Sequence, residues 1–214
     1  MTPQVTAFTW VPAFAQGYVR DLRVRWALEE AGLDYEQVLL SLEAVKSAEQ
    51  RRWQPFGQVP AFRDGEVEMF ESGAIVLYLA GKSSVLAPEG EAGLAQVSSW
   101  IFAALNSIEP LAWACLHFEP HVTPKVEGEG PSARAILEQR LADLAAWLGD
   151  RDYLLGRFTA ADVIMGSVLR ELVEGGALAS FPTLDAYRRR CEARPAFGRA
   201  MAAQLAPFAE NAPA

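Results

Sequence analysis

The chain has 214 residues, which is enough for one large or two small domains with a substantial core. Apolar residues make up 51% of the sequence and charged residues 21%, a balance typical of globular proteins that excludes extended disorder. The net charge of −8 argues against a nucleic-acid partner. No apolar run approaches the roughly 20 residues that a membrane helix needs.

The cysteines and histidines predict neither a disulfide framework nor a metal site. Cys115 and Cys191 lie far apart, and there is no Cys-x-x-Cys motif. His117 and His121 have the spacing of a zinc pair, but Pro120 would break their helix and no third ligand is near. The first residues show neither the basic region nor the apolar stretch of a secretory signal, so we expect a cytoplasmic protein.

The first 83 residues alternate between strand and helix patterns. The order strand, helix, strand, helix, strand, strand, helix predicts an α/β thioredoxin-like domain. Parallel strands joined through a helix imply a right-handed crossover and a ligand edge at one end of the sheet. The predicted elements are strands at 5–10 and 35–40, helices at 22–31 and 44–53, a hairpin with its turn at 63–66, and a helix from Glu71.

The sequence changes character after residue 83. Residues 84–91, which include Pro88 and Gly90, are predicted to be a linker. In residues 92–214 every long segment has helical period and none alternates like a strand, which predicts an all-α helical-bundle domain. The predicted helices cover residues 92–118, 132–148, 160–173, 183–193 and 196–206.

Residues 55–75 are the most informative segment. Pro60 suits the first position of a strand, and its peptide bond with Val59 is predicted to be cis. Val59 would then offer its backbone N–H and C=O to an extended, peptide-like ligand. Ser72 places a hydroxyl beside the free N–H groups of a helix start, where a carboxylate binds well, and Glu71 can accept from an ammonium. Together these groups fit a small zwitterion, although an ordinary hairpin and capped helix would use the same residues.

The segment Gln54-Pro55-Phe56-Gly57-Gln58-Val59-Pro60, followed by Glu71-Ser72, resembles the glutathione-binding half of cytosolic, bacterial-type glutathione S-transferases. The resemblance implies that Val59, Pro60, Glu71 and Ser72 bind glutathione. It also implies that Gln58 contacts the peptide and that Lys46 meets the glycine carboxylate. A solvated lysine is the alternative for Lys46.

A second motif lies in the predicted helical domain. Thr159 is followed three residues later by Asp162, which predicts a capping box at a helix start. The Gly-x-x-Thr-x-x-Asp pattern resembles the central helix of the second domain of the same family. The resemblance therefore extends over nearly the whole chain, and we expect Asp162 to be structural.

Catalysis in this family implies a hydroxyl or thiol near the end of the first strand, where it stabilises the glutathione thiolate. The loop at 9–21 contains neither serine nor cysteine. Counting back from Arg23-Val24-Arg25, which resembles the Arg-Val-Arg of the family, places the helper at Tyr18. Arg20 could act instead through its positive charge. The alternative for Tyr18 is a packing role, with an apolar ring and a hydroxyl that contacts solvent. Thr9 is expected to be structural.

The resemblance implies a transferase that uses the thiolate of bound glutathione against a small, apolar electrophile, as in detoxification, without a metal. Conjugation, thiol-disulfide exchange and isomerisation all stay open. The alternative function is a non-catalytic, transferase-like binding or interaction protein. The family is dimeric, so we also expect a symmetric homodimer, for which Phe56, Arg63, Met69 and Trp100 are candidate contacts.

Overall fold

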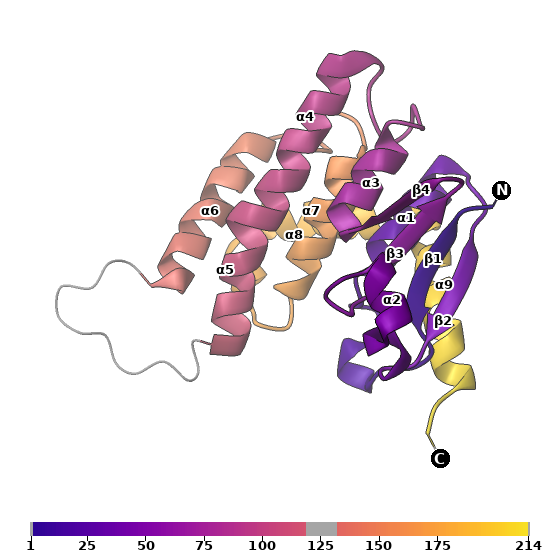
Figure 1. Ribbon diagram of the computed structural model, residues 1–214. Helices are drawn as coiled ribbons and strands as arrows, with labels where there is room; N and C mark the ends of the chain where they lie inside the picture. Colours follow the sequence, from indigo (N-terminus) through magenta and orange to yellow (C-terminus); the bar gives the residue numbers. More distant parts are fainter. Residues whose placement is uncertain (1, 119–131, 214) are drawn as a thin grey trace. The chain divides into compact units, whose positions relative to one another are not determined.

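The computed structural model describes residues 2–118 and 132–213 (Figure 1). The chain divides into two compact units. The first comprises Met1–Gly90 together with Ala193–Ala214, and the second comprises Glu91–Glu192.

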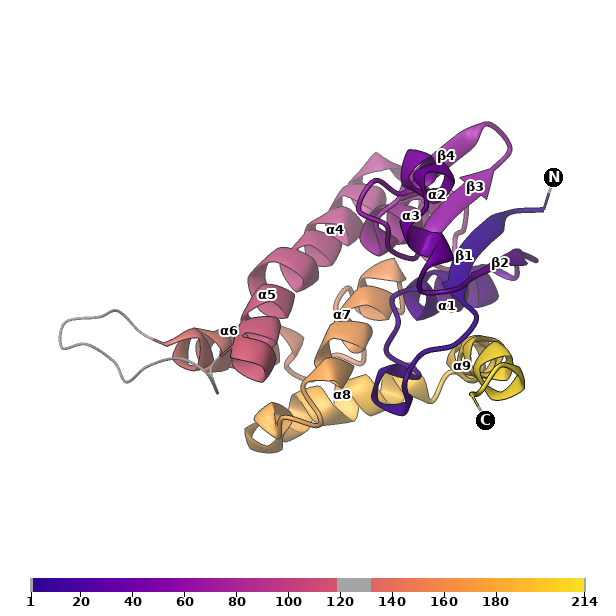
Figure 2. The same ribbon diagram turned by 60° about the horizontal axis from the view of Figure 1, so that its bottom comes forward.

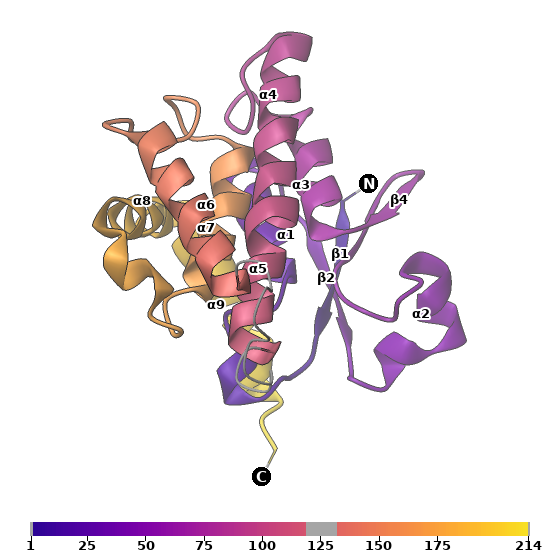
Figure 3. The ribbon, with the colours of Figure 1, turned by 90° about the vertical axis from the view of Figure 1, so that its left-hand side faces the viewer.

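The first unit is built on a four-stranded sheet of order β2-β1-β3-β4. Its strands are β1 (Gln4–Phe8), β2 (Glu36–Leu40), β3 (Ala61–Asp64) and β4 (Val67–Phe70). Three helices flank it, namely α1 (Asp21–Ala31), α2 (Ala48–Trp53) and α3 (Ser72–Ala80). Strand β1 pairs parallel with β2 and antiparallel with β3, which pairs antiparallel with β4. Helices α1 and α3 cover one face of the sheet and α2 lies on the other, as Figure 3 shows, which confirms the predicted thioredoxin-like fold.

Helix α1 is the buried centre of this unit. Every residue from Asp21 to Leu28 is buried, and Trp26 is fully enclosed. The helix ends at Gly32, whose φ of 67° suits glycine and whose N–H closes the last turn. The helix predicted at 22–31 therefore begins one residue earlier, at Asp21.

The segment predicted as one polar helix at 44–53 is divided in two. A 3-10 turn, η2 (Ala44–Lys46), precedes helix α2. Ser47 separates them because its backbone is extended and its hydroxyl accepts from the N–H of Gln50 at 3.2 Å, as an N-cap does. Lys46 is consequently the last residue of η2, directly before the break at Ser47.

The second unit is helical over its described residues, apart from connecting turns. Its segments are α4 (Gly90–Phe102), η3 (Ala103–Ile108), α5 (Glu109–Trp113), η4 (Ala114–Phe118), α6 (Ala133–Leu148), α7 (Ala160–Glu171), η6 (Ala177–Ser180) and α8 (Pro182–Glu192). The prediction of one continuous helix at 92–118 is wrong in detail, since η3 and η4 are π-helical. Pro110 removes an N–H from this stretch, and a wider turn precedes it.

Helix α7 is the core of the second unit and begins with the predicted capping box. The Asp162 carboxylate accepts from the N–H of Thr159 at 2.8 Å, and also from the N–H of Leu154 at 3.0 Å and the hydroxyl of Tyr187 at 2.8 Å. Burial raises the pKa of Asp162, and these hydrogen bonds oppose the shift. The structural role expected for Asp162 follows, because it joins α7, α8 and the preceding loop.

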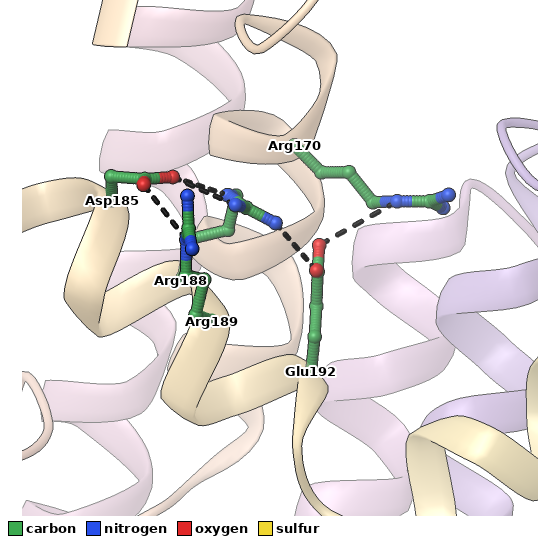
Figure 4. Close-up of polar contacts among 5 residues, drawn as sticks. All are labelled: Arg170, Asp185, Arg188, Arg189 and Glu192. Carbon is green, nitrogen blue, oxygen red and sulfur yellow. Dashed lines mark hydrogen bonds and ion pairs between the residues drawn. The ribbon is translucent and has the colours of Figure 1, made fainter. Parts of the chain in front are cut away.

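A network of ion pairs runs along α8 and reaches α7 through Arg170 (Figure 4). Arg188, whose side chain is 10% exposed, pairs with Asp185 at 2.7 Å and with Glu192. Arg170 of α7 reaches Glu192 at 3.5 Å. Asp185 also holds Arg189 at 2.8 Å, so one acidic residue fixes two arginines of its own helix.

The last helix, α9 (Pro195–Glu210), packs along α1 in the first unit, although its sequence was grouped with residues 92–214 (Figure 2). Arg194 holds Glu30 through hydrogen bonds of 2.6 and 2.7 Å, and Trp26 contacts Phe197 edge-on at 4.9 Å. Helical periodicity reveals a buried face but not the partner of that face, and this is why the sequence did not place α9.

Helix α9 also continues to Glu210, past the end predicted at residue 206. Pro207 cannot donate to the carbonyl of Ala203, four residues earlier. Arg25 of α1 donates to that carbonyl instead, at 3.4 Å. Packing against α1 thus compensates for the proline and allows the helix to continue.

Candidate functional site

The strand register brings the predicted glutathione-binding residues to one end of the sheet. Ala61 pairs with Phe70, so Pro60 before β3 lies opposite Glu71 after β4. The hydroxyl of Thr6 in β1 accepts from the N–H of Ala61 at 2.6 Å, which fixes the start of β3 against β1.

The same end of the sheet receives the two other candidate loops. Phe8 and Leu40, the last residues of β1 and β2, are register partners. The loop that carries Tyr18 and Arg20 follows β1, and the loop that carries Lys46 follows β2. The fold therefore gathers four segments, separated in sequence, at the ligand edge that the element order predicted.

Val59 presents its backbone as predicted. The Val59–Pro60 peptide bond is cis, which confirms that prediction. Within residues 2–118 and 132–213, neither the N–H nor the C=O of Val59 has a hydrogen-bond partner, and the residue is 8% exposed. A nearly buried pair of unsatisfied backbone groups is costly unless a ligand or water pairs with it.

The start of α3 is a second polar position without a protein partner. Glu71 has a φ of 69°, a left-handed conformation found at no other non-glycine residue of the described chain. This conformation costs about 1–3 kcal/mol and is typical of functional sites. Ser72 is 4% exposed, and its hydroxyl has no hydrogen-bond partner among the described residues. No side chain caps α3, so its first N–H groups and its dipole are available to a carboxylate.

Arg51 shapes the loop that carries Lys46. Its Nε donates to the carbonyl of Lys46 at 3.1 Å, and its Nη1 donates to the carbonyl of Pro55 at 3.0 Å. A Cβ at Gly57 would lie 3.2 Å from Arg51 Nη2, and Gly57 has a φ of 64°, so both space and backbone favour glycine. Lys46 itself is exposed.

Gln54 supports the approach to β3 in a similar way. It is 4% exposed, and its Oε1 accepts from the N–H of Gln58 at 3.1 Å. The side chain of Gln58 is exposed. The supporting contacts of Gln54 and Arg51 were not predicted, because nothing in the sequence shows that their side chains turn back onto the loop.

Tyr18 and Arg20 lie in the loop between β1 and α1. The 3-10 turn η1 (Ala13–Ala15) lies within this loop, and the N–H of Tyr18 donates to the carbonyl of Ala15 at 3.0 Å. Both candidates are partly buried, and Arg20 directly precedes α1. Their catalytic roles stay predictions.

A buried polar cluster behind this loop was not predicted. Asp21 and Arg25 are fully buried and pair at 2.6 Å. Gln204 of α9 donates from Nε2 to Asp21 Oδ1 at 2.6 Å and to the carbonyl of Val19 at 3.0 Å. Burial raises the pKa of Asp21, and the adjacent Arg25 charge opposes the shift. The spacing of Asp21 and Arg25 along one helix hinted at their pair, but nothing in the sequence connects either residue to Gln204.

The described part of the chain, residues 2–118 and 132–213, bears on the metal and membrane predictions. Among its residues, no group of three or more His, Cys, Asp or Glu side chains could hold a metal ion. His121 and the side chain of His117 lie outside that part. No described helix is both long and apolar enough to cross a membrane.

Comparison with known proteins relates both the sequence and the fold to one group. Residues 6–81 match the family model described as the N-terminal domain of glutathione S-transferase. Glutathione S-transferase 3 of Zea mays is 34% identical over 203 residues, which span 85% of this chain and 88% of the relative. The disulfide-bond oxidoreductase YfcG of Escherichia coli is 28% identical over 192 residues, spanning 81% and 86%.

Among solved structures, a glutathione transferase from Burkholderia graminis has a similar fold. The TM-score is 0.77 at 25% sequence identity, and the match covers 94% of this chain and 87% of the other. That structure holds two glutathione molecules per protein subunit.

Proposed function

Because the chain belongs to the glutathione S-transferase family, we propose that it binds glutathione at the sheet end formed by Val59, Glu71 and Ser72 and uses its thiolate against a small, apolar electrophile. The observation that carries this proposal is the convergence there of an uncapped α3 start, the free Ser72 hydroxyl and the unpaired Val59 backbone. Each of these groups needs a polar partner, and glutathione supplies one to each.

Each polar group of glutathione has a proposed partner at this end of the sheet. The carboxylate at the amino-acid end of glutathione accepts from Ser72 and the α3 N–H groups, and the adjacent ammonium donates to Glu71. The central cysteinyl unit pairs with the backbone of Val59, as an added strand would. In the proposed complex, Lys46 binds the second carboxylate of glutathione and Gln58 contacts its peptide.

The chemistry begins with ionisation of the bound thiol. At neutral pH this requires a pKa about two units below the ordinary thiol value, which corresponds to about 3 kcal/mol. A hydroxyl donor, a nearby cation or helix-start dipoles can supply such stabilisation. Tyr18 is the first candidate and Arg20 the second. The thiolate then attacks the electrophilic carbon, a C–S bond forms, and a leaving group departs with the bonding electrons.

A second activity is favoured by the likeness to a disulfide-bond oxidoreductase. There the glutathione thiolate attacks a disulfide, forms a mixed disulfide and releases the other sulfur as a thiolate. A second glutathione resolves the mixed disulfide, so one disulfide is reduced and one glutathione disulfide is formed. The two glutathione molecules in the Burkholderia graminis structure match that stoichiometry.

Calorimetry with Ser72→Ala tests the binding site. Loss of one hydrogen bond to a charged carboxylate should weaken glutathione binding by about 1–3 kcal/mol without unfolding the protein. Ser99→Ala is the matched control, because Ser99 is exposed on α4 and, among the described residues, its hydroxyl bonds to the carbonyl of Ala95 alone. Equal affinities in the two variants would remove Ser72 from the site.

Activity assays then separate the possible functions. Turnover of a generic carbon electrophile indicates conjugation, and turnover of a model disulfide indicates the oxidoreductase reaction. Retention on immobilised glutathione with neither turnover indicates the binding-protein alternative. Failure of the wild type to bind glutathione would contradict the proposal as a whole.

A further inference from the structure

We infer that Gln204, on the last helix of the chain, is a positioning residue that holds the loop carrying Tyr18 and Arg20 in place for thiolate stabilisation. This inference deepens the proposed function and rests on it for its catalytic consequence.

Gln204 occupies an unusual position on α9. The buried face of this helix is otherwise apolar, and its remaining members are Ala196, Ala200, Pro207 and Phe208. Gln204 is 1% exposed within this stripe. Burying an amide there costs free energy that hydrogen bonds must offset, and the two bonds made by its Nε2 supply that compensation.

Both bonds are directed at the start of α1. One Nε2 group carries two N–H donors, and these reach the Asp21 carboxylate at 2.6 Å and the Val19 carbonyl at 3.0 Å. Val19 lies between Tyr18 and Arg20, so one side chain fixes the peptide that joins the two thiolate candidates. The N–H of Leu22 also donates to the Val19 carbonyl, at 3.0 Å.

The orientation of the amide follows from charge. Turning the amide over would place its oxygen against the Asp21 carboxylate, which is a repulsive contact. In the observed orientation Oε1 is buried and has no hydrogen-bond partner among the described residues. The position therefore uses glutamine as a double donor and makes no use of its acceptor.

Contacts around Gln204 further fix its position against α1. Arg25 holds the second oxygen of Asp21 at 2.6 Å and also donates to the carbonyl of Ala203, the residue before Gln204. This carbonyl is the one that Pro207 leaves without its helical donor. The register of α9 along α1 is thus fixed at the position where Gln204 reaches the loop.

Two variants with matched chemistry test the inference. Gln204→Met keeps the length of the side chain and removes both donors. Arg199→Met is the control, because Arg199 joins the same two helices through Glu29 at 2.6 Å, and in the described structure its side chain makes no hydrogen bond or ion pair with the loop. Gln204→Asn, which keeps the amide on a shorter stem, serves as the second variant if Gln204→Met does not fold.

Hydrogen exchange provides a readout that does not depend on glutathione. In Gln204→Met, the amides of Tyr18 and Leu22 should exchange at least about tenfold faster than in Arg199→Met at equal global stability. Unchanged protection of these amides in the Gln204 variants would overturn the inference and leave Gln204 as a simple helix anchor.

Titration of the bound thiol by its ultraviolet thiolate absorbance provides the second readout. Gln204→Met should raise the pKa of bound glutathione by about half a unit or more, which lowers the thiolate fraction roughly 1.5-fold or more at neutral pH, and kcat should fall while the glutathione Kd stays close to wild type. Arg199→Met should leave the thiol pKa unchanged. A wild type that does not ionise glutathione would contradict the proposed function alone. A bound thiol pKa in Gln204→Met equal to that in the wild type would contradict the inference.

Discussion

Arg51 illustrates, at the scale of single residues, how an exposed side chain can organise a ligand loop. Its bonds to the carbonyls of Lys46 and Pro55 hold the two ends of the segment that precedes β3. We predict that Arg51→Met weakens glutathione binding by about 1–2 kcal/mol, because each lost hydrogen bond contributes about 0.5–1.5 kcal/mol to the order of the loop. Calorimetry at constant salt measures the change.

Arg52 is the matched control for this prediction. It is the next residue, it is also exposed, and no hydrogen bond or ion pair involves its side chain in the described structure. Arg52→Met removes the same charge and should leave the affinity nearly unchanged. Equal losses in both variants would indicate that Arg51 acts through its general positive charge and not through its two backbone bonds.

Tyr18 and Arg20 can be distinguished by the way each would act on the thiolate. If the Tyr18 phenol lies about 3 Å from the glutathione sulfur, Tyr18→Phe should raise the pKa of the bound thiol and reduce turnover roughly tenfold. Arg20→Ala should instead act through lost charge, with a larger effect at low salt. Steady-state rates across pH and ionic strength separate the two.

Full activity in Tyr18→Phe with a collapse in Arg20→Ala would reverse the assignment. Activity that survives both changes would point to backbone N–H groups, which leave no signal in the sequence because every residue except proline carries one. The sequence identified this loop by its place between the first strand and helix, but hydroxyl chemistry alone could not single out one residue of it.

Asp64 shows, at the scale of elements, how α3 is fixed to the β3–β4 hairpin. This residue ends β3, and its carboxylate accepts from the hydroxyl of Tyr78 in α3 at 3.0 Å and pairs with Lys82 just beyond that helix. The hydrogen bond from Lys82 lowers the pKa of Asp64 below its ordinary value of 3.8. These contacts join the turn of the hairpin to the C-terminal end of α3, which is the end opposite Ser72.

The lowered pKa predicts a specific acid sensitivity. The folded state binds the Asp64 proton more weakly than the unfolded state, so this stabilisation is present above about pH 3.8 and is lost as the pH falls through the lower folded value. Asp64→Asn should cost about 0.2–1 kcal/mol at neutral pH, since the pair is partly exposed. Urea unfolding should show that the difference in the free energy of unfolding between wild type and variant disappears below about pH 3.8. A gap that is constant with pH would contradict this reading.

Elements with strong local signals were predictable from sequence, and elements defined by distant contacts were not. Glycine stops, the Thr159–Asp162 capping box and the Pro60 strand start were all readable, because each acts within a few residues. The docking of α9 was not, since it depends on contacts such as Gln204 with Asp21, which are 183 residues apart. The same limit explains why the sequence offered candidate ligand-binding residues near the sheet end but did not reveal Gln204, whose partners lie at the other end of the chain.

At the scale of the whole molecule, the first unit exposes an aromatic residue beside the ligand loop. Phe56 is 63% exposed and contacts Phe70 edge-on, with ring centroids 6.1 Å apart. A large exposed apolar side chain held by a second ring is a suitable anchor for a partner pocket. We predict that the protein is a symmetric homodimer at micromolar concentration and that Phe56→Ser weakens the dimer roughly thirtyfold or more.

Light scattering and sedimentation across a dilution series measure both parts of this prediction. Leu33→Ser is the control, since Leu33 is 37% exposed in the turn between α1 and β2, at the opposite end of the sheet from Pro60. If Phe56 is an anchor, its serine variant dissociates at concentrations where the Leu33 variant and the wild type stay dimeric. A wild type of monomer mass would contradict the homodimer. A dimer that tolerates Phe56→Ser would place the interface elsewhere, with Trp100 of the second unit as the next residue to change, because its ring packs on Trp147 at 5.2 Å and is only partly buried.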